Sequence, residues 1–254
     1  MTWAGGRRFL IVAIIIALGV AIAALILIPT VYQSPSCTDQ KQNQEEEGVD
    51  CGGPCSYLCA ALVEPPVVRF TKALAQAPGR VDAVAYVENL NRGIAARNVP
   101  YTLTLYGANR TLVKTTSGVI DLPPFTVVPV FVPRFLDMSI EGAQAFLSIE
   151  NSEVRWFSYE KPVVVPTVEG TTVGGSIEAP RVTATITNKG VTPFKDITLV
   201  VVVYDTDKNV MAASQTIIPS LGAQRSTLAT FTWSAPFPRT PAQIEITPLL
   251  PLSP

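Results

Sequence analysis

Residues 197–207 read ITLVVVVYDTD, and residues 99–109 read VPYTLTLYGAN. The two segments align without a gap, and each places a tyrosine after a run of apolar and threonine residues, just before a polar turn. Runs rich in Val, Ile, Leu, Thr and Tyr that end in Asp, Asn or Gly are typical of β-strands. The segments begin 98 residues apart (197 − 99). This spacing predicts an internal repeat of one β module.

The two copies differ in how their apolar residues are spaced. In the first copy Leu103 and Leu105 alternate with threonines, which predicts that the leucines face a core and the threonines face solvent. In the second copy residues 199–203 are apolar at every position, which predicts a strand covered on both faces or a face that awaits a partner. The expected core of the repeat motif comprises Leu103, Leu105, Tyr106, Val201, Val203 and Tyr204.

Further strand patterns surround both copies. The first set of predicted strands covers residues 67–71, 81–87, 99–106, 127–132 and 145–149. The second set covers residues 163–168, 181–187, 197–204, 226–233 and 243–246. About a hundred residues with several short strands is the size of an immunoglobulin-like or fibronectin-like sandwich. We therefore predict two tandem β-sandwiches, at residues 64–160 and 161–250, followed by a tail at 251–254.

The strand ends at residues 103–106 (LTLY) and 201–205 (VVVYD) resemble the motif of the FxLYD family of extracellular β-sandwich modules. The second copy keeps the Tyr204-Asp205 pair, whereas Gly107 replaces the aspartate in the first copy and neither copy has the initial Phe. The resemblance implies structural or adhesive modules without known catalysis.

An apolar run precedes all of these strands. It extends from Phe9 to Ile28 without a charge and follows Arg7 and Arg8. Twenty helical residues span roughly 30 Å, the thickness of a bilayer core, and positive charge is retained in the cytoplasm. We expect a cytoplasmic segment at 1–8, a transmembrane helix at 9–31, and everything from about Tyr32 outside a single-pass cell-membrane protein. The alternative is a cleaved signal, against which stand the length of the run and the absence of an Ala-x-Ala site.

The four cysteines of the chain are Cys37, Cys51, Cys55 and Cys59, all within the predicted juxtamembrane segment 32–63. An even number of cysteines outside the cytoplasm predicts two disulfides, with three possible connectivities. We favour Cys37 with Cys51 or Cys55, because two cysteines only four residues apart close a small, strained loop. A structural metal cluster is the alternative, which the oxidising compartment disfavours.

Between the first two cysteines lies an acidic run that offers oxygen ligands. Asp39, Asn43, Glu47 and Asp50 are candidate ligands for calcium, which prefers six to eight oxygens. Their spacing does not match an EF-hand, and the alternative is a solvated acidic loop held by disulfides.

Residues 50–55 (DCGGPC), with the acidic run before them, resemble a cysteine motif found just outside an N-terminal membrane helix in predicted envelope proteins of uncultured bacteria. Gln40 departs from that motif, which usually has glycine after the aspartate. The resemblance implies an envelope location.

Composition narrows the function. The formal net charge is −1 and the chain has no histidine. The near-neutral charge gives no footprint for nucleic acid, and the missing histidine excludes Ser-His-Asp hydrolases and most zinc enzymes. We predict no enzymatic activity and no cofactor besides calcium. The expected function is a membrane-anchored extracytoplasmic binding or adhesion protein whose partner is an unknown envelope protein or surface polymer. The alternative is a structural or accessory subunit of an envelope complex.

Overall fold

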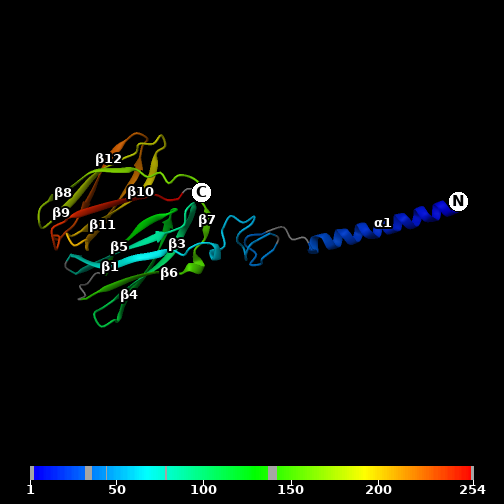
Figure 1. Ribbon diagram of the computed structural model, residues 1–254, viewed down its shortest axis with the longest axis horizontal. Coiled ribbons are helices and arrows are strands. Elements are labelled where there is room, and N and C mark those ends of the chain that lie inside the picture. The colour runs from blue at the N-terminus through cyan, green and yellow to red at the C-terminus, as the bar shows by residue number, and fades with distance from the viewer. Residues whose placement is uncertain (1–2, 32–35, 44, 78, 137–141, 253–254) are drawn as a thin grey trace. The chain divides into compact units, whose positions relative to one another are not determined.

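The computed structural model describes residues 3–31, 36–43, 45–77, 79–136 and 142–252 (Figure 1). The chain forms two compact units, Met1–Cys59 and Ala60–Pro254. Tyr32 and the rest of residues 32–35, predicted to begin the juxtamembrane segment, lie outside the described residues, as do 253–254 of the predicted tail.

The first unit begins with helix α1 (Trp3–Val31). Its stretch Phe9–Ile28 has a mean hydropathy of 3.3, and none of it is buried inside the protein. The helix is long and apolar enough to cross a membrane, and N-terminal signal sequences share these properties.

The second unit is built almost entirely of antiparallel strands. Its first sandwich consists of one sheet in the order β1-β2-β5 and another in the order β4-β3-β6, with β7 paired to the start of β3. The bounds are β1 Val67–Ala77, β2 Arg80–Asn89, β3 Ile94–Tyr106, β4 Leu112–Leu122, β5 Thr126–Leu136, β6 Gln144–Ile149 and β7 Trp156–Ser158. Short 3-10 turns lie at η1 (Ala60–Leu62) and η2 (Asn151–Glu153).

The second sandwich has the same strand order as the first. One sheet runs β12-β9-β8 and the other β11-β10-β13, so that β8 to β13 take the places of β1 to β6. The bounds are β8 Thr167–Gly175, β9 Pro180–Thr187, β10 Phe194–Tyr204, β11 Val210–Leu221, β12 Ser226–Thr232 and β13 Gln243–Leu249. The predicted fold class, two tandem β-sandwiches after one N-terminal apolar helix, is confirmed.

The sequence patterns missed or displaced four strands. Strands β4 and β11 were not predicted, because many of their side chains are exposed and polar and they lack a continuous apolar signal. The three-residue strand β7 was not predicted either. The prediction of a strand at residues 163–168 was wrong at its start, since β8 begins at Thr167. Pro162 and Pro166 flank residues 163–165 and have no N–H to donate to a sheet.

The two sandwiches pack sheet against sheet. Leu199, Val201 and Val203 of β10 enter the core of the second sandwich. Val200 and Val202, on the other face of the same strand, are buried in a second cluster with residues of β1 and β2. The sheets β11-β10-β13 and β1-β2-β5 are therefore the inner layers of a four-layer stack (Figure 1). Of the two explanations for the continuous apolar run, burial on both faces is the correct one.

The chain's end returns to the first sandwich. Leu252, in the predicted tail, is buried, and its backbone N–H donates to Oδ2 of Asp121 on β4 at 2.9 Å. Residues up to Leu252 thus belong to the folded unit.

Candidate functional site

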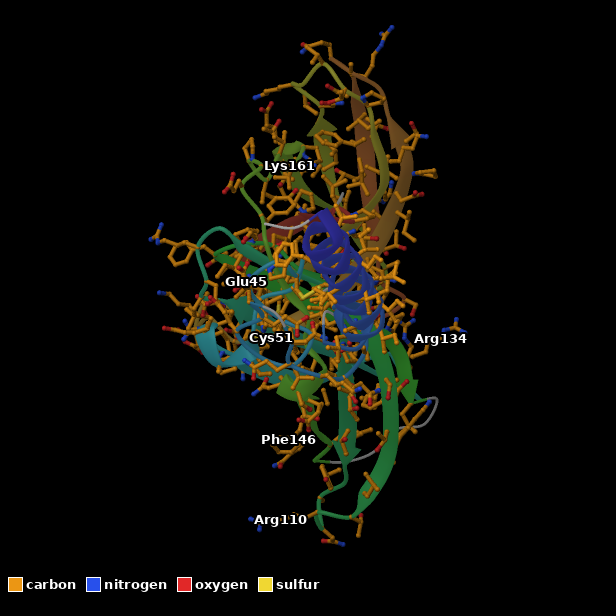
Figure 2. All side chains as sticks on the ribbon, turned by 90° about the vertical axis from the view of Figure 1, so that its right-hand side faces the viewer. Glu45, Cys51, Arg110, Arg134, Phe146 and Lys161 are labelled. Carbon is orange, nitrogen blue, oxygen red and sulfur yellow. A yellow bond between two sulfur atoms is a disulfide. The ribbon has the colours of Figure 1, made fainter. Side chains whose placement is uncertain are left out.

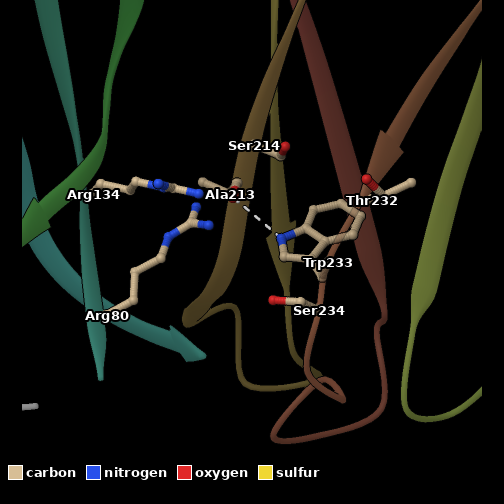
Figure 3. A pocket seen from close by; sticks show the side chains of 7 residues that line it. All are labelled: Arg80, Arg134, Ala213, Ser214, Thr232, Trp233 and Ser234. Carbon is tan, nitrogen blue, oxygen red and sulfur yellow. Dashed lines mark hydrogen bonds between the residues drawn. The ribbon is translucent and has the colours of Figure 1, made fainter. Parts of the chain in front are cut away.

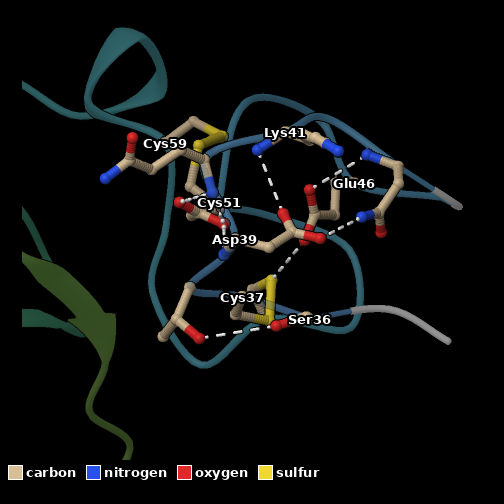
Figure 4. Close-up of a disulfide and its surroundings, with 12 residues drawn as sticks. Ser36, Cys37, Asp39, Lys41, Glu46, Cys51 and Cys59 are labelled. Carbon is tan, nitrogen blue, oxygen red and sulfur yellow. Dashed lines mark hydrogen bonds between the residues drawn. A yellow bond between two sulfur atoms is a disulfide. The ribbon is translucent and has the colours of Figure 1, made fainter. Parts of the chain in front are cut away.

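The cysteine segment forms a small cross-linked loop (Figure 4). Cys37 pairs with Cys55, one of its two favoured partners, and Cys51 pairs with Cys59. No cysteine is free. Sulfurs bonded to each other are not thiolates, so the loop cannot be a four-thiolate metal cluster.

Hydrogen bonds of acidic side chains hold the loop between the disulfides. The Asp50 carboxylate accepts the backbone N–H of Asp39 at 3.0 Å and that of Gln40 at 3.0 Å. Asp39 in turn accepts the Nδ2 of Asn43 at 2.8 Å. Gly53 has a positive φ of 53°, and a Cβ there would collide with the carbonyl oxygen of Glu45. Only glycine fits this turn without strain.

The buried acid of the loop is Glu46. Its side chain lies inside the loop, with Oε2 accepting the backbone N–H of Asn43 at 3.2 Å and Oε1 at 3.2 Å from the Cys55 sulfur. Glu47, the predicted ligand, is exposed. Of the four predicted ligands, Asp39, Asn43 and Asp50 lie together in the structure. The fourth, Glu47, does not join them, and its neighbour Glu46 points into the loop instead. The sequence of residues 45–47 is three glutamates in a row, and it has no pattern that shows which of them points inward. In the structure Glu46 points inward, towards the Cys37–Cys55 disulfide.

The loop fits a hard cation in part. The Asn43 Oδ1 is buried and has no hydrogen-bond partner among the described residues, and the side chain of Glu46 is also buried. Both oxygens of Asp50 are already engaged by backbone N–H groups. Both oxygens of Asp39 are likewise engaged, by the Lys41 N–H and the Asn43 Nδ2. The oxygens best placed for calcium therefore come from Asn43 and Glu46.

The motif residues of the two sandwiches have different surroundings. Leu103, Leu105, Val201 and Val203 are buried in their own sandwiches. The Tyr204 hydroxyl lies 3.0 Å from that of Tyr86 and 3.2 Å from Oε2 of Glu245, so the three groups form a hydrogen-bonded chain. Burial raises the pKa of both tyrosines. Tyr106, the counterpart of Tyr204, instead makes an edge contact with the ring of Phe146 at 5.7 Å.

The turn after each motif strand has the same backbone bonds. The N–H of Gly107 donates to the carbonyl of Thr111 at 3.0 Å, and the N–H of Asp205 donates to that of Asn209 at 3.0 Å. Figure 2 shows Arg110 at the tip of the first turn. Only the second turn has a carboxylate: Asp205 accepts the N–H of Asn209 at 2.8 Å and pairs with Arg239 at 2.6 Å. The Asn209 N–H and the Arg239 guanidinium both lower the pKa of Asp205. Asp205 thus stabilises the turn.

A cleft of about 320 Å³ opens where the two sandwiches meet (Figure 3). Arg80 of β2 and Arg134 of β5 enter it from the first sandwich, with their guanidinium groups next to each other. The opposite wall comes from the second sandwich. It comprises Ala213, Ser214, Thr232, Trp233 and Ser234.

One buried carboxylate positions both arginines. Asp82 is fully buried, and Arg80 binds it with Nε and one terminal nitrogen, each at 2.8 Å. The backbone N–H of Arg134 donates to Oδ1 of Asp82 at 2.6 Å. Arg134 has a positive φ of 49°, a conformation that few residues adopt without support. Asp82 therefore fixes the chain from which the Arg134 side chain extends into the cleft.

On the second wall, the Trp233 Nε1 donates to the Ala213 carbonyl at 3.2 Å, which holds the indole in place. None of the seven lining residues is an acid, a cysteine or a lysine, so they contain no general acid–base pair. The cleft offers positive charge and hydroxyl groups, which suit binding.

Sequence reasoning identified neither arginine. Arg80 and Arg134 are 54 residues apart, and only the β2–β5 pairing, with Val81 opposite Leu136, brings them together. Asp82 within the otherwise apolar run 81–87 is the one signal available, because a buried acid requires a partner.

Neither a protein-family model nor a curated protein sequence matches this chain. Among solved structures, a red sea bream transglutaminase matches at 12% identity and a TM-score of 0.25, over 76% of this chain and 32% of that protein. A β-glucuronidase from glycoside hydrolase family 2 matches at 11% identity and a TM-score of 0.22, over 87% of this chain and 29% of that protein. The chain spans less than a third of either protein, and likenesses at these TM-scores do not inform its function.

Proposed function

We propose that this protein is a membrane-anchored, non-catalytic binding protein that presents its two sandwiches outside the cytoplasm. Helix α1 is the anchor, with residues 1–8 inside, and the disulfide-linked loop belongs to the oxidising side. The resemblance to FxLYD modules and to the cysteine motif of bacterial envelope proteins supports the same assignment. The internal repeat of one β module stays a prediction, and it would support this assignment as well.

One observation carries the binding function. The cleft is lined by residues of both sandwiches, and it exists because Val200 and Val202 pack against the first sandwich. A spacer needs no such contact, since tandem modules separate two points equally well through a linker. A binding protein gains from this contact, because two docked modules form a shared cleft and ligand sites occur preferentially at domain junctions.

Site-directed photo-cross-linking in intact cells tests this function. A photoreactive residue replaces Ser234, in the cleft, or Thr104, on the outer sheet of the first sandwich, in the full-length protein. We expect a cross-linked envelope component from position 234 and none from position 104. Val202→Asp, which separates the sandwiches, should abolish the product.

The opposite pattern identifies the alternative function. Cross-links from position 104 to a defined membrane protein, with none from position 234, would assign the chain as an accessory subunit of an envelope complex. Protease added to intact cells should also remove the sandwiches while sparing an epitope on residues 1–8. A protected C-terminal unit contradicts the proposed orientation.

We also propose that the disulfide-linked loop binds calcium. Two observations support it: the buried Oδ1 of Asn43 has no hydrogen-bond partner in the part of the chain that the structure describes, and the side chain of Glu46 is buried. Calorimetric titration of the full-length protein with calcium should show binding that Glu46→Gln weakens and Glu47→Gln leaves unchanged. Equal effects of the two substitutions, or no heat at millimolar calcium, contradict this site.

A further inference from the structure

We propose that the cleft between the sandwiches binds the carboxylate groups of an acidic polysaccharide, with Arg134 as the main contact. This inference rests on the proposed binding function and adds the chemistry of the ligand. Two guanidinium groups lie beside each other at the junction of the sandwiches (Figure 3).

The charge of the cleft favours an anion. Among the described residues, two guanidinium groups face one carboxylate, Asp82, which leaves one net positive charge (+2 − 1). The Asp82 carboxylate is bound by Arg80 in a bidentate pair, and Arg134 reaches it only through its backbone N–H. Within the described part of the chain the Arg134 guanidinium forms no ion pair, and the residue is exposed. Neighbouring like charges repel, and a bound anion relieves that repulsion.

The geometry of arginine selects the kind of anion. A guanidinium presents parallel N–H groups that match the two oxygens of a carboxylate. Arg134 extends from a backbone that Asp82 holds, so its attachment point is fixed before the ligand arrives. A fixed donor loses less conformational entropy on binding than a mobile one.

The opposite wall suits a sugar better than a peptide. It presents the hydroxyl groups of Ser214, Thr232 and Ser234, which donate and accept hydrogen bonds as sugar hydroxyls require. Its large apolar residue, Trp233, is only 7% exposed. A peptide end would need an apolar pocket for its last side chain, and this cleft offers none.

The test measures binding by the full-length protein in lipid nanodiscs. The probe is a short oligogalacturonate, and the matched control is its methyl ester, which has the same sugars without the charge. A peptide with a free C-terminal carboxylate is the third ligand. The protein variants are Arg134→Gln and, as a control, Lys114→Gln on the exposed strand β4.

We expect the oligogalacturonate to bind and its methyl ester to bind at least about tenfold more weakly. Arg134→Gln should weaken binding about tenfold to a hundredfold, as expected for a lost charge-assisted contact. Lys114→Gln should leave it unchanged. Arg134→Gln keeps the backbone N–H that Asp82 uses, so its melting temperature should match that of the wild type. Arg80 is left intact because its loss would remove the guanidinium that pairs with the buried Asp82.

Four results overturn the inference: no binding of the oligogalacturonate, equal binding of its ester, equal affinity of Arg134→Gln and Lys114→Gln, or tighter binding of the peptide. Cross-linking from position 234 in cells separates this failure from that of the proposed function. A cross-linked ligand together with a negative titration leaves the binding function standing and removes the polysaccharide carboxylate as its target.

Discussion

Strands β3 and β10 occupy the same place in their two sandwiches and differ in what covers their outer faces. On β3 the outer face carries the threonines at 102 and 104. The equivalent positions on β10 are Val200 and Val202. The inner faces of both strands are buried. The outer face of β10 packs against the first sandwich. Valine in place of threonine at these two alternate positions thus distinguishes a strand that docks against another sandwich from a strand at the surface.

The largest effect is expected from a charge placed on the docking face of β10. Val202→Asp puts a carboxylate among Val84, Tyr86 and the neighbouring Glu245, whose own carboxylate would repel it. We expect a loss of about 3–5 kcal/mol in the free energy of unfolding, as for an uncompensated buried charge. Urea denaturation of the full-length protein in detergent measures it.

Thr104→Asp is the matched control on β3. Thr104 is only partly buried, so the same charge should cost less than about 0.5–1 kcal/mol. Small-angle scattering should show that Val202→Asp, and not Thr104→Asp, separates the sandwiches. Equal losses in the two variants contradict the distinction between the strands.

The two sandwiches share a buried asparagine at equivalent positions. Asn89 and Asn188 are fully buried. Each donates from Nδ2 to the carbonyls 33 and 34 residues later, Leu122 and Pro123 for one and Leu221 and Gly222 for the other. Asn89→Ala and Asn188→Ala should each cost about 1–3 kcal/mol, because buried carbonyls lose their donor.

The exposed Asn151 in η2 provides the control, and Asn151→Ala should change stability by less than about 0.5 kcal/mol. The two buried asparagines should give losses of similar size when unfolding is followed by circular dichroism. A large loss for only one of them shows that the equivalent bonds do not stabilise the sandwiches equally.

The extent of prediction from sequence follows from which interactions are local. The alternation at residues 102–105 and the apolar run at 199–203 are visible in a single strand, and they predicted the β fold. The Tyr86–Tyr204 contact and the Arg80–Arg134 cleft each join segments more than fifty residues apart, and no local pattern encodes them. In the loop, residue type predicted the oxygens of Asp39 and Asn43, whereas the choice of Glu46 over Glu47 depends on the cross-links.

A smaller difference between the two strands is expected at the motif tyrosines. Tyr204→Phe removes a hydroxyl from the chain of Tyr86, Tyr204 and Glu245 and should cost about 0.5–1.5 kcal/mol. Tyr106→Phe, at the equivalent position, should cost less than about 0.5 kcal/mol. Equal costs would contradict the different surroundings of the two tyrosines.

Because of its raised pKa, Tyr204 should make the stability of the protein fall at alkaline pH. Burial raises the folded pKa of Tyr204 above its unfolded value of about 10, so the folded state favours the neutral form. Stability is then complete below about pH 10 and falls as the pH rises toward the folded pKa. Melting temperatures between pH 8 and pH 11 should show a smaller decline in Tyr204→Phe, and Tyr106→Phe should retain the decline of the wild type.

The smallest effect is expected at the turns, where Asp205 has the place of Gly107. Asp205→Asn keeps an oxygen for the backbone N–H of Asn209 and loses the charge that pairs with Arg239, whose side chain is 60% exposed. The Arg239 end of the pair is open to solvent, which weakens the attraction, so the change in melting temperature at pH 7 should be small. Hydrogen bonds and Arg239 lower the folded pKa of Asp205, so its stabilisation is present above the unfolded pKa of about 3.9 and is lost as the pH falls through the folded value. The difference between wild type and Asp205→Asn should therefore be largest at neutral pH and vanish in strong acid, while Asp207→Asn, at the 74% exposed neighbour 3.6 Å from Arg239, should show less of it. A difference that stays constant from pH 7 into strong acid would mean that the two turns differ in shape and not in charge.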